Sequence, residues 1–227
     1  MADLAENIRQ IKKNIELAQA RSPFTAKEVT LLAVTKTQDM EHIREAYACG
    51  LCQFGENRVQ ELLTKYESLP QAQWHLIGHL QTNKVKYIID KVKLIHSLDS
   101  LELAAEINKR AAAAKIVMPV LVQVNIAEEK TKFGIQKEEV ETFLAALADY
   151  PNLKVKGLMT IGPYVEDAQE IRPVFRTLRL LSQKESIRKF AHVDMEVLSM
   201  GMSNDYEVAV EEGATVIRLG TTIFGAR

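Results

Sequence analysis

The chain has 227 residues, 47% hydrophobic and 26% charged, which is the composition of an ordinary soluble domain with a sizeable core. Its 29 basic and 30 acidic residues give a formal net charge of -1, so overall charge gives no reason to expect a nucleic acid or an anionic membrane as a partner. The longest apolar runs reach about ten residues, well short of the roughly 20 needed to cross a bilayer. We therefore expect a single domain over residues 1–227 with a small-molecule partner.

The first twenty residues predict an amphipathic helix. Leu4, Ile8, Ile11, Ile15 and Ala18 are spaced alternately four and three apart, which places them on one apolar stripe. Acidic residues occur early, where a secretory signal would have a basic start and a continuous apolar centre. We expect a mature cytoplasmic protein whose N-terminal helix belongs to the fold.

Eight short apolar runs follow and predict β-strands. Segments with helical spacing of apolar residues lie between them, so that each strand is followed by a helix. No linker or low-complexity block interrupts this alternation. The predicted strands are 29–34, 51–54, 74–78, 94–97, 118–126, 155–160, 196–200 and 215–220, and the clearest helices are 100–115 and 137–150.

Strict alternation of strands and helices predicts a parallel sheet, because parallel strands need crossover connections. Eight repeats favour closure into a (β/α)₈ TIM barrel, for which about 250 residues is typical. Only seven residues follow the last predicted strand, too few for a full eighth helix. We expect the N-terminal helix to pack in place of this missing helix; an open doubly wound sheet is the alternative.

The two cysteines occur in the tetrapeptide "CGLC", as Cys49 and Cys52. This spacing occurs in redox pairs and in zinc sites, but no second pair completes a zinc tetrad. The tetrapeptide also spans the end of a predicted helix and the start of a strand. We expect two small core residues.

The carboxyl ends of the strands predict the functional site, because barrel enzymes place their active sites there. In "LLAVTKTQ", Lys36 directly follows the first strand. A lysine forms a Schiff base with a carbonyl when its amine is neutral, and a desolvated pocket favours that state. Spacing alone leaves open that Lys36 simply reaches solvent.

The loops after the last two strands have the pattern of a phosphate site. "SMGMSND" (199–205) precedes an amphipathic run, and "RLGTT" (218–222) adds a glycine and two hydroxyls. A phosphate at one end of the mouth and a lysine at the other indicate a ligand with a phosphate and an electrophilic carbon. Pyridoxal phosphate has both groups.

Six segments with these residues, in order, resemble one known family. They are "AVTKTQ", "FGENRVQE", "WHLIGHLQTNK", "KTKFG", "GLMTIG" and "LSMGMSNDYEVAVEEGATVIRLGTTIFG". Together they resemble the YggS/PROSC family, the pyridoxal phosphate homeostasis proteins, over nearly the whole chain. That family is similar in fold to the N-terminal barrel of alanine racemase, of fold-type III.

The resemblance implies a binding protein that holds pyridoxal 5'-phosphate as a Schiff base on Lys36, exchanges it with the cell and has apo enzymes as candidate recipients. It assigns the phosphate to Ser203, Gly220 and Thr221, and the pyridine nitrogen to Arg218. The remaining pocket residues that it implies are Asn57, Ser199 and Met200, with His79, Met159 and Thr160 as further candidates.

Arg218 bears on catalysis, because a guanidinium beside the ring nitrogen disfavours the pyridinium that best absorbs carbanion electrons. If it is not beside the ring, Arg218 is expected to pair with a neighbouring acid. A racemase also needs two proton-transfer groups, and in alanine racemase, which this site resembles, the second comes from a tyrosine of an additional domain of the partner subunit. Tyr164 and Tyr206 are expected to be exposed loop residues instead. We expect no robust catalysis; the alternative is a fold-type III amino-acid racemase or a related α-carbon enzyme.

The remaining polar residues predict no further site. His75, His79 and His96 come from different strands, and His75 points away from Trp74 in an alternating strand, so we expect no metal site. The lysines of 83–93 are expected to coat a solvated helix face rather than bind an anionic partner. With no large swapping element visible, we expect a monomer.

Overall fold

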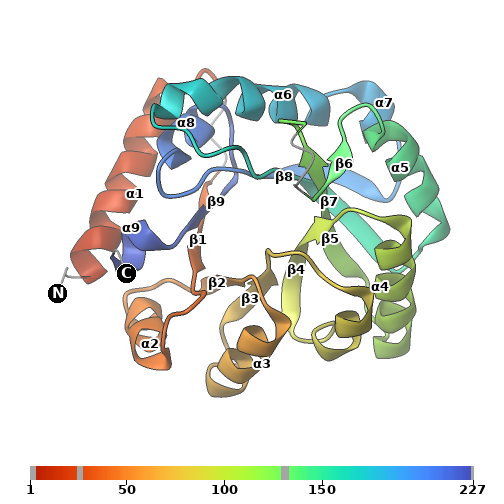
Figure 1. Cartoon of the computed structure of the whole chain (residues 1–227), viewed down its shortest axis with the longest axis horizontal. Coiled ribbons are helices and arrows are strands. Elements are labelled where there is room, and N and C mark those ends of the chain that lie inside the picture. Colours follow the sequence, from red (N-terminus) through yellow and green to blue (C-terminus); the bar gives the residue numbers. More distant parts are fainter. Residues whose placement is uncertain (1–3, 25–27, 129–132, 226–227) are drawn as a thin grey trace.

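The protein is a closed parallel barrel with helices packed around it (Figure 1). The computed structural model describes residues 4–24, 28–128 and 133–225. In the described part of the chain, the order β4-β3-β2-β1-β9-β8-β7-β5 is closed by a further β4–β5 pairing. The predicted TIM barrel is therefore confirmed, and the open doubly wound sheet is excluded.

Eight strands form the ring, and every pairing between them is parallel. Their bounds differ from the predicted ones by at most three residues at either end. A further short strand, β6, pairs with the end of β5 outside the ring. The strands are β1 (Thr30–Val34), β2 (Gln53–Glu56), β3 (Gln73–Leu76), β4 (Val92–Leu98), β5 (Met118–Asn125), β6 (Ile135–Gln136), β7 (Leu153–Met159), β8 (Val193–Ser199) and β9 (Val216–Leu219).

Helices occupy most of the connections between strands. The predicted helix 137–150 is divided into α5 and a 3₁₀ turn. The described helices are α1 (Leu4–Arg21), α2 (Met40–Ala48), α3 (Val59–Ser68), α4 (Leu101–Ala114), α5 (Val140–Ala146), α6 (Arg172–Ser182), α7 (Glu185–Arg188), α8 (Tyr206–Glu211) and α9 (Thr221–Phe224), with 3₁₀ helices at Thr82–Tyr87, Leu147–Asp149 and Ala168–Ile171. None of these helices is both long and apolar enough to cross a membrane.

The connection after β3 differs from the predicted α-helix. Thr82–Tyr87 is a 3₁₀ helix, and β4 begins at Val92. Val85 and Ile88 are both fully buried and are three residues apart, a spacing that the three-residue turn of a 3₁₀ helix aligns on one side. The lysines of 83–93 therefore surround a short turn and the start of a strand, not one face of an α-helix.

The N-terminal helix packs where the sequence predicts it. α1 lies on the outside of the barrel against α8, α9 and α2 (Figure 1), and its five predicted apolar residues are all buried. Asn14 Nδ2 donates a hydrogen bond to Tyr206 Oη at 2.9 Å, and Asn7 Nδ2 donates to Ile223 O at 3.0 Å. α1 thus covers the position that the single turn of α9 leaves open.

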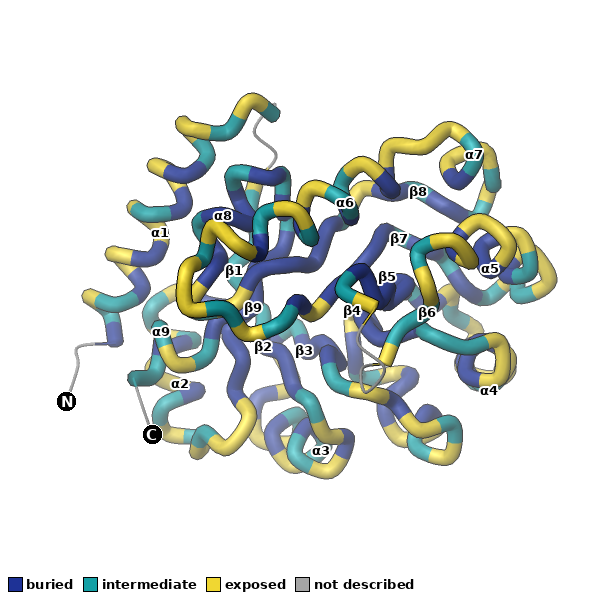
Figure 2. The backbone as a smooth tube through the Cα atoms, turned by 45° about the horizontal axis from the view of Figure 1, so that its top comes forward, coloured by how far each residue is buried: buried dark blue, intermediate teal, exposed yellow. Residues whose placement is uncertain are grey.

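Apolar layers fill the barrel and its surroundings. Figure 2 shows the strands buried over most of their length, with exposed positions on the outer helices and loops. Leu32, Val34, Ile77 and Val216 form one interior cluster, and Leu94, Leu121 and Met159 form another. A larger core lies between the strands and the helices. This packing fixes the strand ends from which the site is built.

The expectation of two core cysteines is wrong for Cys52. Cys52 is exposed and Cys49 is half-buried, and both are free thiols. Gly50 has a φ of 87°, which turns the chain so that Leu51 enters the core instead. The spacing of two cysteines could not reveal which of the residues around this turn is buried.

Candidate functional site at the barrel mouth

Lys36 lies in a turn directly after β1, at the carboxyl end of the barrel. Its neighbour Thr35 is fully buried, whereas Lys36 itself is exposed. An exposed amine at a barrel mouth is accessible to a ligand that enters from outside.

The loop after β9 lies beside Lys36. β1 and β9 are paired, with Leu32 opposite Arg218 and Ala33 opposite Leu219. A Cβ atom on Gly220 would lie only 3.3 Å from the carbonyl oxygen of Val34. The expectation that lysine and phosphate loop lie at opposite ends of the mouth is therefore wrong, because closure makes the first and last strands neighbours.

The loops after β8 and β9 are joined to each other. Arg218 N donates to Gly201 O at 3.0 Å, and Thr222 N donates to Ser203 Oγ at 3.4 Å. Ser203 and the segment 220–221 consequently lie side by side. The structure brings together the three residues predicted to bind phosphate, next to the Lys36 turn.

Arg218 extends from β9 into the barrel interior, where it is 5% exposed. Its Nη1 donates to Ser199 Oγ at 2.8 Å and its Nη2 donates to Thr160 O at 2.9 Å. Burial lowers the pKa of Arg218 to about 10, an effect that the charge of Asp205 opposes, so the guanidinium remains charged at neutral pH. These hydrogen bonds go to a hydroxyl and a carbonyl. Over the part of the chain that the structure describes, Arg218 therefore does not pair with a neighbouring acid, which was the alternative expectation for this residue.

Two buried histidines extend this network. His96 Nδ1 lies 3.0 Å from Ser199 Oγ, and His96 Nε2 lies 2.9 Å from His75 Nδ1. Because a guanidinium only donates, Ser199 accepts from Arg218 and is free to donate its proton to His96 Nδ1. His96 then donates from Nε2 to His75 Nδ1, and the remaining proton of His75 is on Nε2, which has no hydrogen-bond partner among the described residues. In the hydrogen-bonded series Arg218–Ser199–His96–His75, each side chain thus donates to the next one.

Both histidines in this chain are neutral. Burial lowers the pKa of His75 to about 3 and the pKa of His96 well below its ordinary value of 6.5. His75 does point away from Trp74, as predicted, since Trp74 packs against Phe54 in the outer core with ring centroids 5.4 Å apart. Among the described residues, no three His, Cys, Asp or Glu side chains gather as a metal site would require.

Three more predicted residues lie at or below the mouth. Asn57 is half-buried directly after β2, and Met159 belongs to the interior apolar cluster. Thr160 Oγ1 donates to Val124 O at 2.8 Å, and its carbonyl is the acceptor for Arg218. Thr160 therefore orients Arg218 through its backbone.

Two other candidates point elsewhere. The side chain of Met200 is fully buried in the core between the strands and the helices, so only its backbone is free to line the mouth. His79 is partly exposed and stacks on Phe133, with ring centroids 3.9 Å apart and its Nδ1 3.6 Å from Asp99. His79 belongs to the rim of the barrel.

The two tyrosines differ. Tyr164 is 80% exposed, as predicted. Tyr206 is buried, and its hydroxyl accepts a hydrogen bond from Asn14 of α1, so the expectation of an exposed loop residue is wrong there. The first residue of α8 faces α1 because that is where α1 covers the barrel.

Sequence reasoning missed two buried polar contacts. One is the His75–His96 hydrogen bond, and the other is an ion pair between Glu56 and Lys65, whose charged atoms are 2.6 Å apart. An acid that ends a buried strand in "QFGE", with a lysine nine residues later on the next helix, was the available signal. Periodicity alone does not reveal which strand-end acid is buried.

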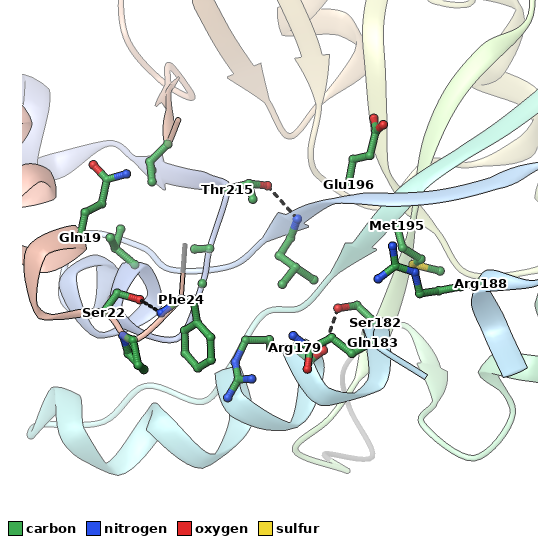
Figure 3. Close-up of a pocket in the computed structure, with 16 residues that line it drawn as sticks. Gln19, Ser22, Phe24, Arg179, Ser182, Gln183, Arg188, Met195, Glu196 and Thr215 are labelled. Atoms are coloured by element: carbon green, nitrogen blue, oxygen red, sulfur yellow. Dashed lines mark hydrogen bonds between the residues drawn. The ribbon is translucent and has the colours of Figure 1, made fainter. Parts of the chain in front are cut away.

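A separate pocket of about 360 Å³ lies away from the mouth (Figure 3). Its walls come from the end of α1, from α6 and from residues such as Met195 and Thr215 at the amino ends of the strands. Arg179 stacks on Phe24, with its guanidinium carbon 3.7 Å from the ring centroid. The pocket is therefore at the opposite end of the barrel from Lys36.

Known proteins resemble the chain over nearly its full length. The family described as "Alanine racemase, N-terminal domain" matches residues 7–227. A pyridoxal phosphate homeostasis protein of Aquifex aeolicus is 48% identical over 224 residues, covering 98% of this chain and 97% of that protein, and one of Escherichia coli strain K12 is 37% identical over 232 residues, covering 100% and 98%. The structure of PipY from Synechococcus elongatus PCC7942 with PLP bound is similar with a TM-score of 0.84 at 33% identity, covering 98% of this chain and 100% of that chain.

The neutral histidines predict a loss of stability in acid. Their pKa values are lower in the folded protein than the ordinary 6.5, so below that pH the unfolded chain binds more protons and stability falls as pH falls toward 3. Each histidine contributes about 1.4 kcal/mol per pH unit within this window. Urea denaturation between pH 7.5 and 4.5 measures the slope.

His75→Leu separates this effect from other titrations. We expect the variant to lose about half of the histidine contribution, roughly 1.4 kcal/mol per pH unit. His42→Leu is the matched control, because the His42 side chain is 45% exposed. Identical slopes for wild type and His75→Leu would contradict the assignment.

Proposed function

We propose that this chain, which belongs to the family of the pyridoxal phosphate homeostasis proteins, binds pyridoxal 5'-phosphate at its barrel mouth, within a single domain over residues 1–227. The observation that carries the proposal is the pairing of β1 with β9, which places an exposed lysine beside the loop of Gly220 and Thr221. The PLP-bound structure of PipY, a relative of full-length similarity, supports the same ligand.

The chemistry of the ligand fits this arrangement. Pyridoxal phosphate has its aldehyde and its phosphate arm on neighbouring ring atoms, so an amine and a phosphate site that bind it must also be neighbours. Lys36 supplies the amine, and we propose that it condenses with the aldehyde to form a Schiff base, with the carbonyl oxygen leaving as water. The ring nitrogen is across the ring from the aldehyde, and we assign it to Arg218, which extends into the barrel interior.

The phosphate is assigned to Ser203, Gly220 and Thr221. Their two hydroxyls and the glycine backbone lie where the loops after β8 and β9 meet. Asn57 and Ser199 are assigned to the pocket wall. Met200 joins them through its backbone, since its side chain is in the core.

Arg218 favours storage of the cofactor over catalysis. It remains charged and has only donors, so it disfavours a protonated ring nitrogen and weakens the cofactor as an electron sink. Tyr206 is engaged with α1 and is not available as a second proton-transfer group at the mouth. We propose a role in intracellular homeostasis and delivery of the cofactor, by a cytoplasmic monomer, with apo enzymes as recipients.

Lys36→Ala tests the attachment. The variant is expected to fold normally but to lose the visible absorbance of the Schiff base after incubation with pyridoxal phosphate, because no other group is assigned to the aldehyde. Lys12→Ala, which removes an exposed lysine of α1, is the matched control and should keep the spectrum. A spectrum that survives Lys36→Ala unchanged would refute the assignment.

Ser203→Ala and Thr221→Ala test the phosphate site. Each should weaken cofactor retention by about 1 to 3 kcal/mol, the worth of one charge-assisted hydrogen bond. Equilibrium dialysis of the bound cofactor measures the change. Ser68→Ala at the end of α3 is the control, and equal retention in all four proteins would argue against the site.

Exchange of α-protons tests the absence of robust catalysis. Holo-protein incubated with a panel of L- and D-amino acids in deuterated water should show no rapid incorporation at the α-carbon. Nuclear magnetic resonance follows the exchange, with an alanine racemase as the positive control. Robust turnover would favour the alternative, a fold-type III racemase or related enzyme.

A further inference from the structure

A buried ion pair contacts the residue before Lys36. Lys65 Nζ lies 2.6 Å from Glu56 Oε1, and the two side chains are 9% and 0% exposed. Lys65 Nζ also donates to the carbonyl oxygen of Thr35 at 2.7 Å, and Thr35 Oγ1 donates to Glu56 Oε1 at 2.5 Å. The Glu56–Lys65 pair thus binds both the backbone and the side chain of Thr35.

The residue after Lys36 is held from the same helix. Thr37 N donates to Glu61 Oε2 at 3.2 Å, and Glu61 Oε2 lies 3.7 Å from Lys65 Nζ. Thr37 has a φ of 63°, a left-handed conformation that a β-branched residue adopts only under constraint. The turn that carries Lys36 is therefore strained and is fixed on both sides by side chains of β2 and α3.

Stability does not account for this pair. Burial raises the pKa of Glu56, which means that the protein pays a desolvation cost that Lys65 and Thr35 only partly offset. Within the described parts of the chain, Glu56 Oε2 is buried without a hydrogen-bond partner. Well-packed apolar residues in place of a buried ion pair are often equally stable or more stable. Such a replacement would, however, remove the hydrogen bonds to Thr35.

We infer that the Glu56–Lys65 pair positions Lys36 for reaction with an aldehyde, by holding Thr35 and, through Glu61, the strained Thr37. This inference rests on the proposed attachment of pyridoxal phosphate to Lys36. Glu56 and Lys65 are positioning residues, because they act through the turn and not on the ligand. Pre-organisation of an amine at the tip of a fixed turn lowers the entropy lost when the new bond forms.

The test replaces the pair with apolar residues, as Glu56→Leu/Lys65→Met. The matched control is Lys156→Met/Asp194→Leu, which removes a partly buried pair with the same 2.6 Å separation between β7 and β8. Two ligands are compared: pyridoxal phosphate, which reacts with Lys36, and pyridoxine phosphate, which has an alcohol in place of the aldehyde. Urea denaturation confirms that each variant is folded.

We expect the Glu56→Leu/Lys65→Met variant to bind pyridoxal phosphate at least tenfold more weakly than wild type. Pyridoxine phosphate should bind within about twofold of wild type, because its phosphate and ring sites are untouched. The control variant should bind both ligands normally. Equal weakening of both ligands, or no weakening of either, would overturn the positioning role. Failure of wild type to form the Schiff base would instead overturn the proposed function.

Glu61→Ala provides a second, independent readout, because it removes the acceptor of Thr37 N. If the apolar variant does not fold, Glu61→Ala decides: about threefold weaker pyridoxal phosphate binding with unchanged pyridoxine phosphate supports it, and no change refutes it.

Discussion

The parallel pairing of β1 with β9 is the contact on which the site depends. It closes the barrel and aligns Leu32 with Arg218, so that the turn after the first strand and the loop after the last one become neighbours. Without this pairing, Lys36 and Gly220 would be at opposite edges of an open sheet. α1 covers the β1–β9 contact from outside, because it forms hydrogen bonds with both α8 and α9.

A hydrogen-bonded chain of polar side chains inside the barrel begins at Arg218, on the β9 side of the same contact. Arg218 is buried, and its charge is accommodated by a hydroxyl and a carbonyl instead of a carboxylate. Ser199 in turn donates to His96, and His96 donates to His75; both histidines are neutral. These neutral acceptors do not neutralise the positive charge of Arg218. In the proposed function, that charge faces the ring nitrogen of the cofactor.

Much of the fold follows from local patterns in the sequence. Apolar runs between helical segments are sufficient to identify the eight barrel strands, and the stripe from Leu4 to Ala18 identifies α1 as a packing helix. The candidate site follows from the rule that strand ends form the mouth. These signals are local in the chain, and barrel geometry translates them into position.

The remaining features depend on contacts between distant residues. The adjacency of Lys36 to segment 220–221 follows from closure, the burial of Tyr206 from the placement of α1, and the Glu56–Lys65 pair from the packing of α3 on β2. No periodicity in the sequence contains this information. The exposure of Cys52 likewise depends on the turn at Gly50 and not on the general preference of cysteine for protein cores.

The most direct test of the account is the site of covalent attachment. The purified protein would be saturated with pyridoxal phosphate, reduced with borohydride, digested and analysed by mass spectrometry. The account predicts one dominant labelled peptide, modified at Lys36. Absence of label, or label spread over other lysines with Lys36 unmodified, would contradict it.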